Sequence, residues 1–398
     1  MKLRSKLLTV AAVTVTGLAA AVLPMTVSNA AEACAAAWNA SQVYVGGNVA
    51  SLSGHNYRAK WWNQNESPAT HSGQWDVWAD QGACGGTTPP TTPPPTDPPP
   101  SNGTKMPAAP YIYPGWGAQP DIAAVMGSGV GVRSFTIAFV LASYSCNAVW
   151  DGESGLTGGN HAATINAIKS RGGTVIPSFG GWQGAKLGTY CTTAQSLADQ
   201  YMRVIDTFGL QAIDIDIENT DEFENYAVAD RIVDALKIVK QRKPGVTTIL
   251  TFGTTPSGPN VHGIRLINQV KAKNAGVDIF TQMPFDFGGQ GNMYNATVGA
   301  TEGLKNQLKS TFGWTDAQAY SHIGISGMNG VSDVGEQTTP AIWQQIVSYA
   351  KSRGLSRLAY WAANRDRQCP GGATGELSSD CSGVAQSLWQ FSSISAGF

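Results

Sequence analysis

The sequence is poor in charged residues, which make up 13% of its 398 residues and leave a formal net charge of −1. It has no basic patch of the kind that binds nucleic acid, so we expect no nucleic-acid partner. It has no Cys-x-x-Cys pair and no histidine cluster, which argues against a bound metal. No Gly-x-Gly-x-x-Gly turn follows a strand-like run, which counts against a nucleotide-binding fold.

Long apolar runs are also scarce. The run that comes nearest to membrane-spanning length covers residues 7–23, directly after three cations within the first six residues. Small residues then lead to Ala30, which completes the pattern of a secretory signal peptide over residues 1–30. The run is too short and wrongly flanked for a stable anchor. We therefore expect a secreted, extracellular protein without membrane association.

The six cysteines are even in number, as expected in a compartment where disulfides persist. Six cysteines allow about fifteen pairings, and the spacing favours bonds between neighbours. The expected disulfides are Cys34–Cys84, Cys146–Cys191 and Cys369–Cys381.

Residues 85–105 divide the chain, with the sequence GGTTPPTTPPPTDPPPSNGTK. Proline at this density favours an extended polyproline II spacer with a reach on the order of 60 Å. We expect a small module at residues 31–84, this linker, and a large domain at residues 106–398. Such a spacer lets two modules move independently on one target.

The small module is crowded with aromatic residues, among them the adjacent pair Trp61 and Trp62. A segment this short can bury three or four of its rings, so some are expected to be exposed. If the pair lies in a strand, its two rings face opposite sides, and one of them faces outward. Exposed rings of this kind stack on sugars, although for any single ring a place in the core is the simpler interpretation.

The segment that begins AWNASQVYVGG and ends in QWDVW, nearly all of residues 34–84, resembles carbohydrate-binding modules of families 5 and 12. Its most specific part is YRAKWW, residues 57–62. The resemblance implies a small all-β module that binds chitin or cellulose. It also implies that Trp61 and Trp62 contact the polysaccharide and that Trp38 assists them.

The large domain alternates strand-like runs with helix-length amphipathic segments, which predicts an α/β fold, a (β/α)8 TIM barrel. An open, doubly wound sheet is the alternative. The expected strands are 110–116, 133–141, 173–181, 212–218, 247–253, 277–287, 322–328 and 357–364. The expected helices are 161–171, 193–208, 222–243, 261–275, 299–312, 338–353 and 382–391.

The run AIDIDIE, residues 212–218, alternates isoleucine with Asp214, Asp216 and Glu218. In a barrel strand the isoleucines would pack against helices and the acids would point inward, with Glu218 nearest the C-terminal face. Crowded carboxylates raise one another's pKa, so the group should keep a proton for acid catalysis. A salt-bridge network or an oxygen-liganded calcium or magnesium ion is the alternative, although one strand makes a poor cage.

The same run resembles the DxxDxDxE signature of family 18 glycoside hydrolases, with Gln211 in place of the first acid. SFGG at residues 178–181 is similar to the family's SxGG strand. MPFD at residues 283–286 is similar to its MxYD motif, with phenylalanine in place of tyrosine. YWAANRD at residues 360–366 is similar to its last strand. The resemblance covers residues 110–398.

This resemblance implies a chitinase in which Glu218 is the general acid and the 2-acetamido oxygen of the substrate attacks C1. Asp216 would orient that group and stabilise the oxazolinium, while Asp214 would share a proton with Asp216. Asp286 would bond to the same sugar, and Trp361 would form the floor of its subsite. The enzyme would retain the anomeric configuration and need no cofactor.

Other residues of the same motifs complete the expected substrate site. Met283 begins the MPFD motif, and Phe285 lacks the hydroxyl that would bond to the acetamido group, so Gln282 or a water would replace that donor. Trp116 and Trp182 follow the first and third strands. They would extend the groove, or simply pack in their loops.

Three functions compete at this point. The first is a monomeric chitinase that acts on chitin or N-acetylglucosamine oligomers. The second is an endo-β-N-acetylglucosaminidase that acts on glycoprotein glycans, which a module for insoluble polymers argues against. The third is a non-catalytic lectin on the same barrel, which Glu218 argues against.

Overall fold

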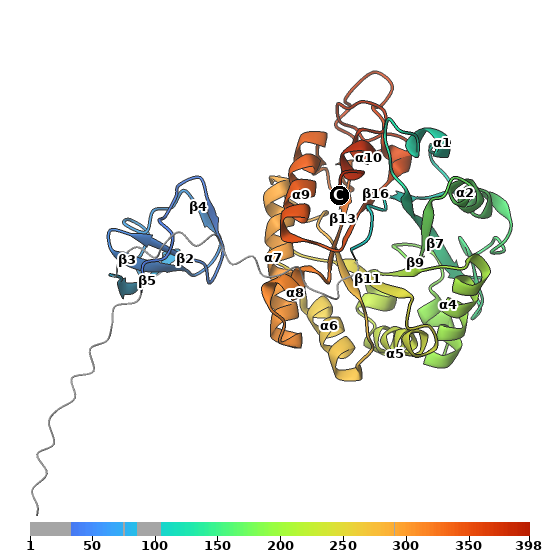
Figure 1. Cartoon of the computed structure of the whole chain (residues 1–398), viewed down its shortest axis with the longest axis horizontal. Coiled ribbons are helices and arrows are strands. Elements are labelled where there is room, and N and C mark those ends of the chain that lie inside the picture. Colours follow the sequence, from blue (N-terminus) through green and yellow to red (C-terminus); the bar gives the residue numbers. More distant parts are fainter. Residues whose placement is uncertain (1–32, 75, 86–104, 290) are drawn as a thin grey trace, which may run out of the picture. The chain divides into compact units, whose positions relative to one another are not determined.

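The computed structural model describes residues 33–74, 76–85, 105–289 and 291–398. The predicted signal peptide and nearly all of the predicted linker lie outside these residues. The chain divides into two compact units on either side of residues 92–93 (Figure 1). The expected boundaries at residues 84 and 106 lie next to undescribed residues and stay predictions.

The small unit is built from short antiparallel strands. β2, β3 and β5 form a three-stranded sheet, and β1 pairs with β4. The strands are β1 (Val43–Tyr44), β2 (Val49–Leu52), β3 (His55–Ala59), β4 (Asn63–Gln64) and β5 (Trp78–Ala83). Tyr44 and Trp78 are buried edge to face, with ring centroids 4.9 Å apart, while Trp38 and Tyr57 pack partly against them. The Cys34–Cys84 disulfide joins the two ends of this all-β unit.

The large unit is a barrel of eight parallel strands, which confirms the predicted (β/α)8 fold (Figure 1). Each strand overlaps one of the expected runs. The strands are β6 (Tyr111–Ile112), β7 (Ser134–Ala142), β9 (Thr174–Gly180), β10 (Ala212–Ile217), β11 (Thr247–Gly253), β12 (Ile279–Met283), β13 (Ile323–Met328) and β16 (Arg357–Trp361). The backbone N–H of Ala109, just before β6, donates to the carbonyl of Leu358 in β16 at 2.8 Å, which closes the ring.

Helices cover the outside of this ring (Figure 1). The longer ones are α2 (Gly159–Lys169), α4 (Ala194–Phe208), α5 (Tyr226–Arg242), α6 (Val261–Lys273), α7 (Met293–Phe312) and α9 (Pro340–Arg353). The shorter ones are α1 (Ile122–Val125), α3 (Leu187–Tyr190), α8 (Asp316–Tyr320), α10 (Gln390–Ser395), the π-helix η1 (Asn219–Phe223) and the 3-10 helix η2 (Ala363–Arg365). β8 (Ala148–Trp150) pairs with β7, and β14 (Gly330–Val331) pairs with β15 (Gln337–Thr338).

The helix expected at residues 382–391 is wrong, because α10 begins only at Gln390. The carboxylate of Asp366 accepts the backbone N–H groups of Phe391 at 3.0 Å and Ser392 at 2.7 Å. These are free donors of the first helical turn, so a distant acid sets where the helix starts. The Cys369–Cys381 and Cys146–Cys191 disulfides are those that neighbour spacing favours.

Candidate active site

Asp214, Asp216 and Glu218, here called the acid row, lie along and just beyond β10. Ile213, Ile215 and Ile217 belong to the hydrophobic core, while Asp214 and Asp216 are buried on the opposite face of the strand. Glu218 follows the last residue of β10 and is partly exposed. The alternation expected from the sequence is therefore present, and the row rises toward the C-terminal face of the barrel. Gln211, the departure from the family signature, is exposed below the strand.

Asp214 is held by hydroxyl groups from three other barrel strands. It accepts hydrogen bonds from Tyr111 at 2.6 Å, Ser178 at 2.8 Å and Thr251 at 2.6 Å. The guanidinium of Arg357, which is fully buried, lies 3.4 Å from the same carboxylate. Partners on β6, β9, β11 and β16 place Asp214 inside the barrel and leave it little freedom to move. The expected proton sharing with Asp216 stays a prediction.

Asp216 is the middle member of the row and is buried. Its Oδ1 is buried without a hydrogen-bond partner among the described residues. Burial, together with Glu218 and Asp214, raises its pKa well above the ordinary value. Its backbone carbonyl accepts the N–H of Gly181 at 2.9 Å, and a Cβ at Gly180 would come within 2.2 Å of that carbonyl. The glycines of the SFGG stretch are thus needed for close contact with β10.

The pKa of the Glu218 carboxyl group suits a general acid. Burial raises its pKa to about 7, Lys186 acts in the opposite direction, and Asp286 and Asp333 raise it further. A carboxyl group with this pKa still holds its proton near neutral pH. Glu218 also lies at the strand end, where active sites of this fold occur.

Asp286 lies in the turn after β12, in the left-handed region with φ of 56°. Its backbone N–H and that of Phe287 each donate to the carboxylate of Glu336 at 2.8 Å. Glu336 is buried, so it fixes the turn that presents Asp286. Sequence reasoning missed Glu336 because it lies far along the chain and belongs to no motif.

Gln282 does not point toward the acid row, and its expected role as the replacement donor is wrong. Its amide is buried outside the barrel, hydrogen-bonded to Thr301 of α7 at 2.7 Å. Strand alternation therefore directs the next residue, Met283, to the inside. Phe285 follows the strand and is partly exposed.

Trp361, at the end of β16, belongs to an aromatic cluster at the top of the barrel. Its ring stacks on Phe139 of β7 at 5.6 Å with an interplanar angle of 13°. Tyr111 and Tyr113 lie 5.8 and 6.1 Å from it. Phe139 was missed from the sequence, although its position in a predicted strand could have suggested it. The partly exposed Trp361 ring gives a flat apolar surface on which a sugar can stack.

Trp116 and Trp182 lie in loops that follow β6 and β9. They are 54% and 64% exposed, and Trp116 packs edge-on against Tyr113 at 5.1 Å. Both rings are therefore accessible to a ligand, and their expected role in extending the groove stays a prediction.

Two buried charged residues near the acid row were also missed. Lys186 lies in the loop between β9 and α3, and Glu222 lies in η1. Lys186 lies outside every expected helix and strand, and Glu222 was expected as the first residue of the helix at 222–243, so neither position indicated a buried charge.

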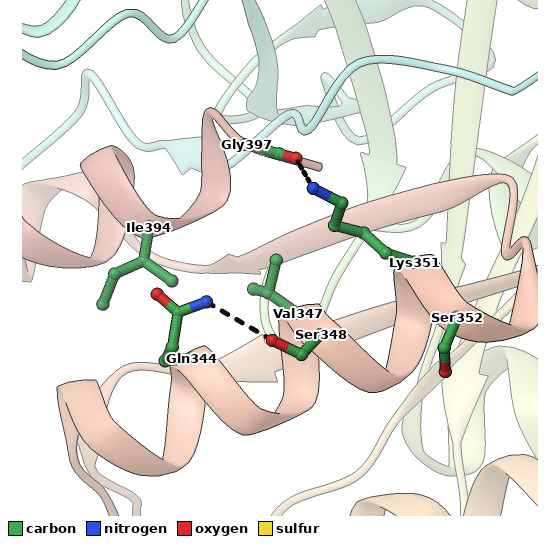
Figure 2. A pocket seen from close by; sticks show the side chains of 7 residues that line it. All are labelled: Gln344, Val347, Ser348, Lys351, Ser352, Ile394 and Gly397. Atoms are coloured by element: carbon green, nitrogen blue, oxygen red, sulfur yellow. Dashed lines mark hydrogen bonds between the residues drawn. The ribbon is translucent and has the colours of Figure 1, made fainter.

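A pocket of about 410 Å³ lies elsewhere, between α9 and the end of the chain (Figure 2). Lys351 donates to the carbonyl of Gly397 across it at 2.6 Å. The residues that line it are Gln344, Val347, Ser348, Lys351, Ser352, Ile394 and Gly397. None belongs to the acid row or its aromatic cluster, so we do not regard this pocket as the candidate site.

Trp61 and Trp62 of the small unit are both exposed, at 48% and 54%. The condition under which one ring would face outward and the other inward is not met, because the pair lies between β3 and β4 and not in a strand. Two neighbouring rings on one exposed bend can contact adjacent sugars. Trp38 packs against the buried core of the unit, so its assisting role stays a prediction.

No helix within the described ranges is long and apolar enough to cross a membrane. No group of three or more His, Cys, Asp or Glu side chains in that part of the chain is arranged to hold a metal ion.

Comparison with known proteins gave related sequences and folds. The "Probable bifunctional chitinase/lysozyme" of Escherichia coli is 28% identical over 313 residues, 73% of this chain and 34% of that protein. "Endochitinase 11" of Metarhizium anisopliae is 26% identical over 348 residues, 83% of this chain and 64% of that protein. This chain thus spans less than two thirds of either relative's length.

A solved structure, active domain 2 of a chitinase from Pyrococcus furiosus, is 28% identical. It matches with a TM-score of 0.65, over 73% of this chain and 95% of that one. Residues 37–79 match carbohydrate-binding module family 5/12. Residues 120–328, more than half of the chain, match the glycosyl hydrolases family 18. The barrel, its acid row and these matches lead to one conclusion: this chain belongs to glycosyl hydrolase family 18 and carries a carbohydrate-binding module of family 5/12.

Proposed function

We propose that the protein is a secreted chitinase that hydrolyses β-1,4 bonds between N-acetylglucosamine units. The observation that carries this proposal is the acid row, whose outermost member, Glu218, has a pKa raised to about 7 by burial. The relatives named as chitinases support the substrate class. Three disulfides and the signal-like N-terminal sequence support secretion.

The first step is cleavage with help from the substrate itself. Glu218 gives its proton to the glycosidic oxygen, and the bond from that oxygen to C1 breaks. The acetamido oxygen of the same sugar forms a new bond to C1, which gives a cationic oxazolinium. Because this oxygen is the nucleophile, no second carboxylate has to attack, unlike in the usual two-carboxylate scheme.

The second step is hydrolysis of that intermediate. Glu218, now a carboxylate, takes a proton from water as the water attacks C1, and the acetamido group is released. Two displacements at C1 retain the β configuration, and Glu218 is protonated again for the next cycle.

Asp216 and Asp214 act on the cation. Asp216 accepts the acetamido N–H and stabilises the positive charge as the ring closes. The cation favours the charged form of Asp216, and the proton that Asp216 held passes toward Asp214. The three hydroxyls and Arg357 hold the Asp214 carboxylate in position. Asp286 and the Trp361 ring hold the same sugar.

The test is to offer the purified protein oligomers of N-acetylglucosamine and of glucose of equal length, with the product anomers followed by NMR. We expect cleavage of the acetylated oligomer alone, with the β-anomer formed first. Initial release of the α-anomer would contradict the mechanism. Binding of the acetylated oligomer without any cleavage would indicate a lectin. Cleavage of glycoprotein glycans but not of the oligomers would indicate an endo-β-N-acetylglucosaminidase.

The binding module provides a separate prediction. Replacing Trp61 and Trp62 together with alanine should weaken adsorption to insoluble chitin about tenfold or more, since each lost stacking contact costs about 1 kcal/mol. Cleavage of soluble oligomers should stay unchanged, because the pair lies in the small unit. The checks are adsorption isotherms and oligomer kinetics. The matched control is Tyr144→Ala, which removes a ring that is 77% exposed on the large unit. Unchanged adsorption would remove the pair from chitin binding.

A further inference from the structure

The β14–β15 hairpin (residues 330–338) lies between β13 and α9, at the C-terminal face of the barrel. Just before it, the backbone N–H of Asn329 donates to the carbonyl of Trp361 at 3.2 Å. Within it, the N–H of Ser332 donates to the carbonyl of Glu336 at 2.8 Å, and both residues are buried. The hairpin is therefore a fixed part of the barrel rim, next to the strand that carries the Trp361 ring.

The carboxylate of Glu336 bridges two backbone groups in the turn after β12. Its Oε2 accepts the N–H of Asp286 and its Oε1 accepts that of Phe287, each at 2.8 Å. Glu336 is 3% exposed, and burying a carboxylate is costly unless charge-assisted hydrogen bonds replace its lost water. A glutamine in this place would turn its NH2 group toward one of the two N–H donors. The turn therefore needs a carboxylate to keep both bonds.

The hairpin also holds the side chain of Asp286. The hydroxyl of Ser332 and the backbone N–H of Val334 donate to the Asp286 carboxylate. Asp286 is exposed, and its φ of 56° is a conformation that residues other than glycine adopt rarely. Such a conformation persists where the surroundings impose it, and here Glu336 supplies the bonds that do so. One hairpin thus fixes both the backbone and the carboxylate of Asp286.

The bonds of Glu336 go to the turn and the hairpin, so any effect on substrate must pass through Asp286. We propose that Glu336 is a positioning residue, which presents the Asp286 carboxylate to the sugar bound at the acid row. This inference rests on the proposed chitinase function, in which Asp286 holds that sugar. It adds to the site a residue that belongs to none of the family motifs considered above.

A purely structural brace is the alternative role for Glu336, and the two roles differ in their dependence on Asp286. A positioning residue affects catalysis only while the carboxylate that it positions is present. A brace affects the stability of the fold whether or not that carboxylate is there. Misplacing a group that orients substrate by about 1 Å can cost about a hundredfold in rate, so the positioning effect is large enough to measure.

The test is a double-mutant cycle on kcat/KM for soluble N-acetylglucosamine oligomers, with Glu336→Gln, Asp286→Gly and the double variant. Glycine adopts the left-handed turn without strain and removes the carboxylate. We expect Glu336→Gln to lower kcat/KM about ten- to a hundredfold when made alone. In the Asp286→Gly background it should change kcat/KM by less than about twofold, because no carboxylate is left to position.

Glu302→Gln is the matched control for general destabilisation. Glu302 lies on α7 and also accepts two hydrogen bonds, from the hydroxyls of Tyr320 at 2.6 Å and Tyr349 at 2.7 Å. Its replacement should lower the melting temperature and leave kcat/KM of the folded protein unchanged.

Ser332→Ala is a milder variant that decides the question if Glu336→Gln fails to fold. It removes one donor to the Asp286 carboxylate, so it should give a smaller loss that again disappears in the Asp286→Gly background. Equal losses in both backgrounds, or no loss in either, would overturn the inference in a protein that cleaves oligomers. The chitinase proposal would then stay intact.

A wild type that cleaves no oligomer would contradict the chitinase proposal instead. Hydrogen exchange at the amides of Asp286 and Phe287 then tests the positioning without turnover. Glu336→Gln should speed exchange at these two amides, because one of them loses its acceptor. Unchanged exchange at both would overturn the inference.

Discussion

Replacing Glu218 with glutamine should lower kcat on N-acetylglucosamine oligomers by about a thousandfold or more, within the range typical of a lost general acid. Glutamine has almost the same shape but no proton to give to the leaving oxygen. KM should change little, because the amide still fills the same place beside the acetylated sugar. Steady-state kinetics on oligomers, with the fold checked by circular dichroism, measures this effect.

The matched control is Glu224→Gln, an exposed glutamate six residues further along the chain, which should leave kcat unchanged. The wild-type profile gives a second check, since kcat/KM should fall as pH rises through about 7, the pKa of Glu218. A Glu218→Gln variant with near-normal turnover would show that another group protonates the leaving oxygen.

Replacing Asp216 with asparagine should lower kcat by about a hundredfold, with a much smaller change in KM. Asparagine can still accept the acetamido N–H, so the substrate binds. It cannot carry the negative charge that stabilises the oxazolinium, so the loss appears when the cation forms. The Oδ1 of Asp216, which has no hydrogen-bond partner within the described part of the chain, is free to accept the acetamido N–H when substrate binds.

The same kinetics on Asp199→Asn provide the comparison for Asp216→Asn. Asp199 lies on α4, where it pairs with Arg242 at 2.6 Å on the surface. Its replacement should leave kcat unchanged. Equal effects of Asp216→Asn on kcat and on ligand dissociation constants would mean that Asp216 binds the ground state and plays no special part in forming the cation.

Much of the fold could be predicted because apolar residues recur along the chain at different spacings in strands and in helices. The eight strands and most of the longer helices were found from runs of apolar residues with the spacing of strands or helices. The helix at residues 382–391 failed because Asp366, which caps α10, lies well outside the local pattern. The outward orientation of both Trp61 and Trp62 could not be predicted, because no residue type within the pair indicates that it lies outside a strand.

The candidate site likewise contains features that the sequence predicts and features that only the structure shows. The acid row could be predicted, since alternation along one strand places its members on one face. The orientation of Gln282 could not be predicted from the neighbouring motif, because it depends on Thr301 of α7, which holds the Gln282 amide outside the barrel. The environment of Asp214 depends on Tyr111, 103 residues before it, and on Arg357 across the barrel.

The sequence by itself thus determined the family, the barrel and the order of the three acids, because these depend on neighbours along one chain segment. Only the tertiary structure decided which charges surround Glu218. Lys186 and Glu222 come from separate segments, and glycine at positions 180 and 188 leaves room for the Glu222 carboxylate. The protonation of a buried acid depends on every charge within a short distance in space, and distance along the chain does not report that distance.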